Sequence, residues 1–136
     1  MPAPFGDYNL ASYSVLCDRS EIRLLAQRSF PGKPRTTEIV FSGVVAYHFE
    51  HDNFGTILGH IIERPLDAFL HQHAAQLTDG SRQSGWAQFW SGSVADALAH
   101  LQASSVHAFE LISSYGLRGW VLARTCDTHA ADVHVA

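Results

Sequence analysis

Hydrophobic and polar residues alternate along the first part of the chain with the period of two that is typical of β-strands. The alternation covers residues 8–17 and 21–28, and the polar residues 18–20 between them resemble a turn. This pattern predicts a hairpin of two antiparallel strands. Residues 29–35 contain two prolines and one glycine, which predicts a surface loop after the hairpin.

Residues 36–50 carry the strongest strand signal, because they are rich in Val, Ile, Phe, Tyr and Thr. Both faces are apolar in the middle, which predicts a central strand covered at least partly on both sides. A polar turn at 51–53 precedes a second alternating segment, residues 54–63. We therefore expect these two segments to pair as an antiparallel hairpin.

The spacing of apolar residues changes to three and four after Pro65, which is typical of an amphipathic helix. The apolar stripe consists of Leu66, Phe69, Leu70, His73, Ala74 and Leu77. It predicts a helix over residues 65–78 that ends at the turn-forming residues 78–81. A second helix is expected over residues 93–103, with Ser93 at its N-terminal cap.

Two more alternating segments, residues 106–113 and 117–124, predict a closing hairpin, and residues 125–136 are expected to fray. This order predicts an α+β fold, with a mainly antiparallel sheet of about six strands and two helices inserted after strand four and packed on one face. A single domain should span residues 1–136. The side chains expected to be largely buried are Phe41, Val45, Tyr47, Ile57, Ile61, Phe69, Leu70, Leu98, Leu101 and Val121.

Composition narrows the class of function. The chain of 136 residues is 46% hydrophobic and 16% charged, which suits a folded core. Nine basic residues against thirteen acidic ones give a net charge of −4, so nucleic acid is not expected as a partner. The sequence shows no membrane helix and no signal peptide, and its two cysteines are too few for a disulfide scaffold. We therefore expect a cytoplasmic protein.

Motifs of nucleotide-binding loops, serine hydrolases and zinc peptidases are absent from the sequence. Nine histidines are many for this length, but their spacing does not suit a metal. His71 and His73, for example, are two residues apart on a predicted helix and point in different directions. The sequence thus predicts no metal and no cofactor.

The densest group of chemically active side chains lies at the expected hairpin tip, residues 47–54, and consists of His48, Glu50, His51 and Asp52. It has three interpretations. The group is a polar turn that protects the end of an apolar strand, an acid–base or metal-contacting patch, or a recognition loop for a basic partner.

Aromatic residues form a second candidate binding feature. Trp86, Phe89 and Trp90 lie in an expected loop, and Trp120 lies in the last expected strand. Tryptophan is enriched at binding surfaces, whereas a loop of this length also folds its aromatic side chains over a core. Both interpretations stay open, so Trp86 and Trp90 are candidate binding residues.

Two segments of the chain resemble parts of small uncharacterised bacterial proteins, domains of unknown function. They are EIVFSGVVAYHFE at 38–50 and SSYGLRGWVLA at 113–123. Those proteins are similar, in size and α+β layout, to the immunity-type proteins that accompany toxins. The resemblance implies a small cytoplasmic binding protein and assigns no catalytic residue.

Two functions follow as expectations. The leading one is a non-enzymatic binding protein, because no nucleophile–base or metal-spaced motif occurs. The alternative is a small enzyme or ligand-binding domain with a site around residues 47–54. A concave pocket lined by His48, Glu50 and a tryptophan, with perturbed pKa values, would favour the alternative. A flat or convex acidic surface would favour the leading function.

We also expect a homodimer. The predicted 36–63 pair is apolar on both sides, whereas two short helices cover only one face. An exposed apolar face promotes association, and two-fold pairing of one surface is the commonest solution. Sheet-face residues or the 86–90 segment would then form the interface.

Overall fold

Eight strands and two helices form residues 4–28 and 35–131, the part of the chain that the computed structural model describes. The strands are β1 Pro4–Leu16, β2 Glu21–Arg28, β3 Arg35–Ser42, β4 Ala46–Glu50, β5 Ile57–Arg64, β6 His107–Tyr115, β7 Arg118–Ala123 and β8 Thr125–Ala130. The helices α1, Leu66–Ser84, and α2, Val94–Ala103, follow β5. The expectation of about six strands with the helices after strand four is therefore wrong. The expected loop at 29–35 lies, apart from Arg35, outside the described residues.

The two additional strands have separate causes. The expected strand 36–50 is divided at Gly43, whose φ is +64°. A side chain there would collide with Arg124, because a Cβ on Gly43 would lie 2.8 Å from Arg124 Cγ. The segment expected to fray begins as β8, because it pairs along β3 from Ser42 to Thr37. The remainder of that segment, residues 132–136, lies outside the described residues.

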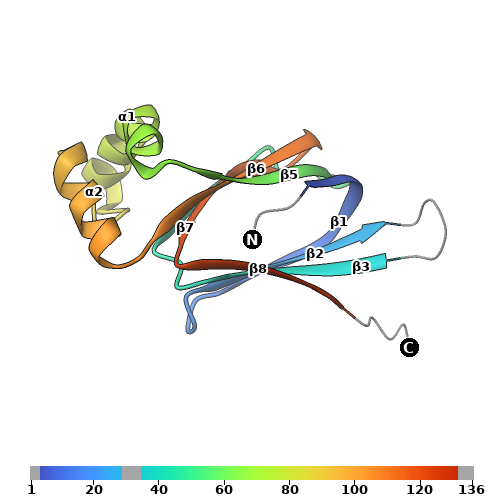
Figure 1. Cartoon of the computed structure of the whole chain (residues 1–136). Helices are drawn as coiled ribbons and strands as arrows, with labels where there is room; N and C mark the ends of the chain where they lie inside the picture. The colour runs from blue at the N-terminus through green and yellow to red at the C-terminus, as the bar shows by residue number, and fades with distance from the viewer. Residues whose placement is uncertain (1–3, 29–34, 132–136) are drawn as a thin grey trace.

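Strand pairing closes the sheet on itself. β1 pairs with β2 and β5, β2 with β3, β3 with β8, and β6 with β5 and β7, all antiparallel. β8 continues β7 after Arg124, and β4 continues β3 after residues 43–45, so the ladder of β3 and β8 leads into that of β4 and β7. Figure 1 shows β5 and β6 in one layer, β2, β3 and β8 in the other, and the helices at one end.

The expected hairpins at 8–28 and 106–124 are confirmed, whereas the one between 36–50 and 54–63 is wrong. β4 pairs with β7, and β5 lies between β1 and β6. The reason lies at the bend after β3, where the Arg124 N–H donates to the carbonyls of Ser42 and Gly43. That contact directs β4 along β7, so residues 51–56 cross between ladders instead of forming a hairpin turn.

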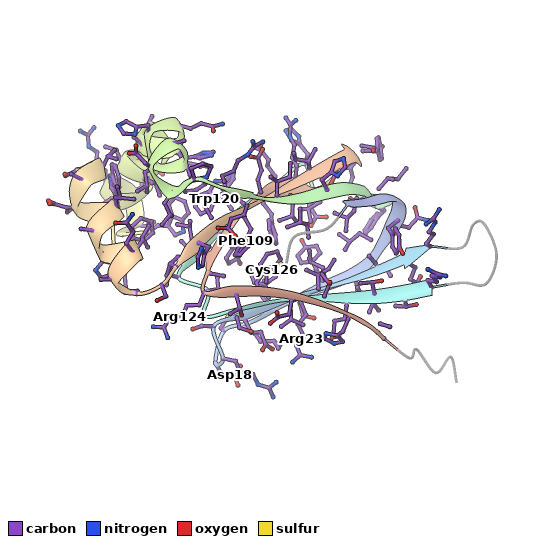
Figure 2. The ribbon with its side chains drawn as sticks, in the orientation of Figure 1. Asp18, Arg23, Phe109, Trp120, Arg124 and Cys126 are labelled. Carbon is purple, nitrogen blue, oxygen red and sulfur yellow. The ribbon has the colours of Figure 1, made fainter. Side chains whose placement is uncertain are left out.

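Two apolar clusters use opposite faces of the same strands. The interior cluster is centred on Ile22, Leu24, Ile39, Phe41, Phe109 and Val121. The second cluster joins the helices to the outer face of β4, β6 and β7 through Phe69, Leu77, Trp90, Leu101, Trp120 and Leu122. Figure 2 shows Phe109 and Cys126 between the two layers and Trp120 on the side of α1. The helices thus pack against the outer face of β4, β6 and β7, at one end of the sheet.

Most of the predicted core is confirmed: Phe41, Ile61, Phe69, Leu70, Leu101 and Val121 are buried. Ile57 and Leu98 are half-buried. Val45 and Tyr47, however, are 46% and 36% exposed. Their predicted burial assumes a central strand, whereas β4 has β7 as its one neighbouring strand within the described residues.

Helix α1 is longer than predicted. Gly80, which belongs to the predicted helix end, lies inside the helix, where a Cβ would lie 2.3 Å from Trp86 Cε3. Glycine therefore makes room for the indole ring. The helix ends at Gly85, with φ +68°, where the Gly85 N–H donates to the Ser81 carbonyl.

Helix α2 begins as predicted after Ser93, whose hydroxyl accepts the N–H of Asp96. Across the described residues, neither helix has the length and hydropathy needed to cross a membrane.

Candidate functional site

A groove of about 440 Å³ lies between α1 and the outer face of β4, β6 and β7, and we call it the α1 groove. Its volume is in the range of small-molecule sites. The lining residues are His48, Glu50, Gln72, His73, Ala75, Gln76, Glu110, Leu111, Arg118, Gly119 and Trp120. In Figure 2, Trp120 lies between the strands and α1, where it forms the floor of the groove.

Strand register brings the strand residues of the groove together. His48 on β4 lies opposite Trp120 on β7, and Trp120 lies opposite Glu110 on β6. These three residues form one row across the sheet. Glu50 and Arg118 are paired two residues further along. Because alternate residues of a strand point to the same face, all five side chains lie on the helix side of the sheet.

Each carboxylate at the groove has an arginine partner. Glu50 Oε1 lies 3.6 Å from Arg118 Nε, and Glu110 Oε2 lies 2.6 Å from Arg64 Nε. His48 Nε2 is 3.7 Å from the second oxygen of Glu50. These side chains are between one-third and two-thirds exposed, so water screens the pairs and they contribute little to stability. Their relevance is to what the groove presents to a ligand.

Helix α1 supplies the imidazole of His73. Its ring centroid lies 4.5 Å from that of Phe69 and 5.7 Å from that of Trp120. Burial lowers the pKa of His73, and the Glu110 carboxylate and a hydrogen bond with Gln76 offset only part of this effect. The ring is therefore neutral at pH 7, with one nitrogen as donor and one as acceptor.

Gln76 links the helix to the floor of the groove. Its Oε1 accepts a hydrogen bond of 3.2 Å from Trp120 Nε1, and its side chain also hydrogen-bonds His73. The indole N–H thus holds the Gln76 amide, and ring contacts with Phe69 and Trp120 hold the imidazole beside it. A wall whose side chains are already held loses little freedom when a ligand binds.

The four residues expected at the 47–54 tip are divided in the structure. His48 and Glu50 line the α1 groove. His51 has a φ of 56° and lies beside Arg118, with 3.4 Å between Nε2 and Nη2. Asp52 accepts a hydrogen bond from the hydroxyl of Tyr13 on β1, and this bond raises the pKa of Tyr13. The structure therefore places only half of the expected group in one site.

Both candidate tryptophans pack in the cluster between helices and sheet. Trp90 is 7% exposed and donates its Nε1–H to Thr78 Oγ1 at 3.1 Å. Trp86 is half-buried, and its ring centroid lies 5.7 Å from that of Trp120. Trp86 also borders a depression that contains the exposed Val45.

Four groove residues were not singled out from the sequence: His73, Gln76, Glu110 and Arg118. His73 did give a signal, since it is the one polar member of the predicted apolar stripe. The other three gave none, because their position in a site depends on which strands are neighbours.

A larger depression, of about 600 Å³, lies where β5 meets α1 and α2. Its Glu63 and His107 pair with each other at 3.2 Å and are about half exposed. Fewer polar groups converge there than in the α1 groove. Among the described side chains, those of residues 8–28 and 35–131, three or more His, Cys, Asp or Glu nowhere gather as a metal site would require.

Comparison with known proteins adds no relative: no family model matches the chain, and neither does any curated protein or solved structure. The resemblance to immunity-type proteins therefore stays a prediction, and the geometry of the α1 groove carries the argument about function.

Proposed function

We propose that the protein binds a small polar molecule in the α1 groove. The observation that carries this proposal is the convergence of seven polar side chains, from one helix and three strands, above a buried indole. They are His48, Glu50, Gln72, His73, Gln76, Glu110 and Arg118. The groove is a concave pocket with His48, Glu50, a tryptophan and a perturbed pKa, which favours a ligand-binding domain over a flat interaction surface.

Binding without catalysis is the simpler form of this function. The lining residues that the structure describes include no Ser, Thr, Cys or Tyr that would act as a nucleophile. We also propose that the protein acts in the cytoplasm, a location supported by two cysteines that form no disulfide.

The test uses a pair of matched substitutions on α1. Ala75 lines the groove, whereas Ala68 lies on the same helix outside it, and both are exposed. We expect a panel of small sugars, amines and carboxylic acids to contain at least one compound that raises the melting temperature of the native protein and of Ala68→Phe, but not of Ala75→Phe. A bound ligand stabilises by about 2.7 kcal/mol at about 100 times its Kd. The proposal is refuted if a compound raises the melting temperatures of Ala68→Phe and Ala75→Phe equally. It is also refuted if no compound raises the melting temperature of the native protein.

A protein partner, including a second copy of the chain, is the second candidate. The premise for the homodimer has changed, because the 36–63 pair does not form. The observation that now favours a partner is the second edge of β4, which has no neighbouring strand among the described residues. Val45, Tyr47 and Phe54 are exposed along or beside it. Light scattering tests the homodimer: a mass that stays near 15.0 kDa as concentration rises excludes it.

A further inference from the structure

The charges around the α1 groove cancel in pairs. Glu50 and Arg118 form one pair within the groove, and Glu110 is paired with Arg64, which lies outside the lining. The remaining titratable groups that face the groove are His48 on β4 and His73 on α1, and His73 is held neutral. A site without excess charge does not concentrate ions of either sign. An organic cation or anion is therefore not the ligand that this groove favours.

The groove is also too polar for an apolar ligand. A lipid-like molecule would remove water from two carboxylates and a guanidinium without replacing the hydrogen bonds of that water. A suitable ligand must offer hydrogen bonds to nearly every group that it covers.

Hydroxyl groups meet this demand, because each one donates and accepts. The carboxylates of Glu50 and Glu110 accept, the guanidinium of Arg118 donates, and His73 offers the ring nitrogen that does not bond Gln76. Glu50 and Arg118 lie 3.6 Å apart, so two neighbouring hydroxyls of one molecule fit one on each. Such bonds to charged partners are stronger than those between neutral groups.

We propose that the ligand of the α1 groove is a neutral polyhydroxylated molecule of the sugar or cyclitol class. This inference rests on the proposed function, since it names the ligand for the same groove. The hydroxyls lie against Glu50, Arg118 and Glu110, while Gln76 and Trp120 hold the wall in place.

The experiment is an NMR titration of the full chain, with the backbone amides of Gly119 and Trp120 as reporters. The neutral probes are glucose, galactose, mannose, ribose, N-acetylglucosamine and myo-inositol; agmatine is the cationic probe and citrate the anionic one. We expect at least one neutral probe to give a saturable shift, while agmatine and citrate give none. Its Kd should change less than about twofold when about 0.5 M NaCl is added, because salt screens only the contribution of charge.

A matched pair of variants tests whether the ligand binds in the α1 groove. Glu50 and Glu63 are 49% and 50% exposed, and each lies beside a histidine, but only Glu50 lines the groove. We expect Glu50→Gln to weaken binding about tenfold or more, through loss of a charge-assisted hydrogen bond, and Glu63→Gln to leave the Kd unchanged.

The outcomes separate this inference from the proposed function. If agmatine or citrate saturates the reporters and no neutral probe does, the ligand class is wrong while the groove remains a binding site. A neutral probe that binds Glu50→Gln and Glu63→Gln equally overturns the assignment to the groove. If no probe of any charge shifts Gly119 and Trp120, the inference and the proposed function are both refuted.

Discussion

The buried imidazole of His73 makes the stability of the protein depend on pH. His73 has an ordinary pKa of 6.5 in the unfolded chain, and burial lowers it in the folded protein. As the pH falls below 6.5, the unfolded state takes up this proton before the folded state does. The free energy of unfolding should therefore decrease on acidification from 6.5 down to the folded pKa, and level off below it.

Urea unfolding at about pH 7.5 and about pH 5.5 measures this effect. Native protein should lose stability between the two conditions, and His73→Gln should lose less, because the titrating group is gone. His71→Gln is the control, since His71 lies on the exposed side of the same helix. An identical loss in His73→Gln and native protein would contradict the expected proton uptake.

The two cysteines should differ sharply in reactivity. Burial raises the pKa of Cys126 to about 12, and its side chain is 4% exposed, whereas Cys17 is exposed. At about pH 8 a thiol with that pKa is ionised in only on the order of one molecule in ten thousand. We expect one thiol to react rapidly with a chromogenic disulfide reagent in the native protein, none in Cys17→Ser, and the second thiol only after unfolding. Rapid reaction of two thiols would show that Cys126 is accessible.

At the scale of single elements, β7 depends on a glycine. A Cβ on Gly119 would lie 1.9 Å from the carbonyl oxygen of His48, so Gly119→Ala cannot keep the pairing of β4 and β7. We expect a loss of about 2–3 kcal/mol in the free energy of unfolding. Binding of the proposed ligand in the α1 groove should be lost as well, since His48 and Trp120 flank this contact.

Gly55→Ala is the control for backbone strain alone. Gly55 has a φ of +87°, and no atom lies within 4 Å of the place that a Cβ would take there, so the substitution should cost about 1 kcal/mol. Similar losses in the two variants would mean that the β4–β7 contact tolerates a methyl group.

The helices and local hairpins were predictable because their signals are local. Periodicity located α1 and α2, and alternation located the first and last hairpins. Two predicted boundaries were wrong at glycines, because one predicted element was too long and the other too short. Gly43 belongs to a predicted strand, although it bends the chain, and Gly80 belongs to a predicted helix end, although it accommodates Trp86 within the helix. The contact at Gly43 comes from Arg124, which is far away in the sequence, and the contact at Gly80 comes from Trp86, which lies beyond the predicted helix.

At the scale of the whole molecule, neighbouring strands were the main error. The sequence does not show that β4 runs along β7. The chain bends between β3 and β4 and again between β7 and β8, and the contact between Gly43 and Arg124 joins these two bends. The site was predictable to the same extent. His48 and Glu50 were found from one strand, whereas Glu110 and Arg118 join them only through pairing across β7.

β8 gives a direct test of the closed sheet. The Ala131 N–H donates to the Thr36 carbonyl, and donors alternate along an antiparallel ladder, so the N–H of Asp127 faces β3. Asp127→Pro removes that donor and should lower the free energy of unfolding by about 2 kcal/mol or more. Asp127 is exposed, so Asp127→Ala is the matched control and should change little. If Asp127→Pro is as stable as Asp127→Ala, this segment frays as the sequence suggested.

Closure of the sheet also determines when the fold can be completed during synthesis. The hydrogen bond between His129 and Glu38 joins residues 91 positions apart. β8 is the last neighbour of β3 to be synthesised. A nascent chain on the ribosome holds β3 with an open edge until residues 125–130 have emerged. Chains dominated by such distant pairings fold in milliseconds to seconds rather than microseconds. During that interval the interior face of β3, with Ile39 and Phe41, is an exposed apolar surface that chaperones bind and through which chains aggregate.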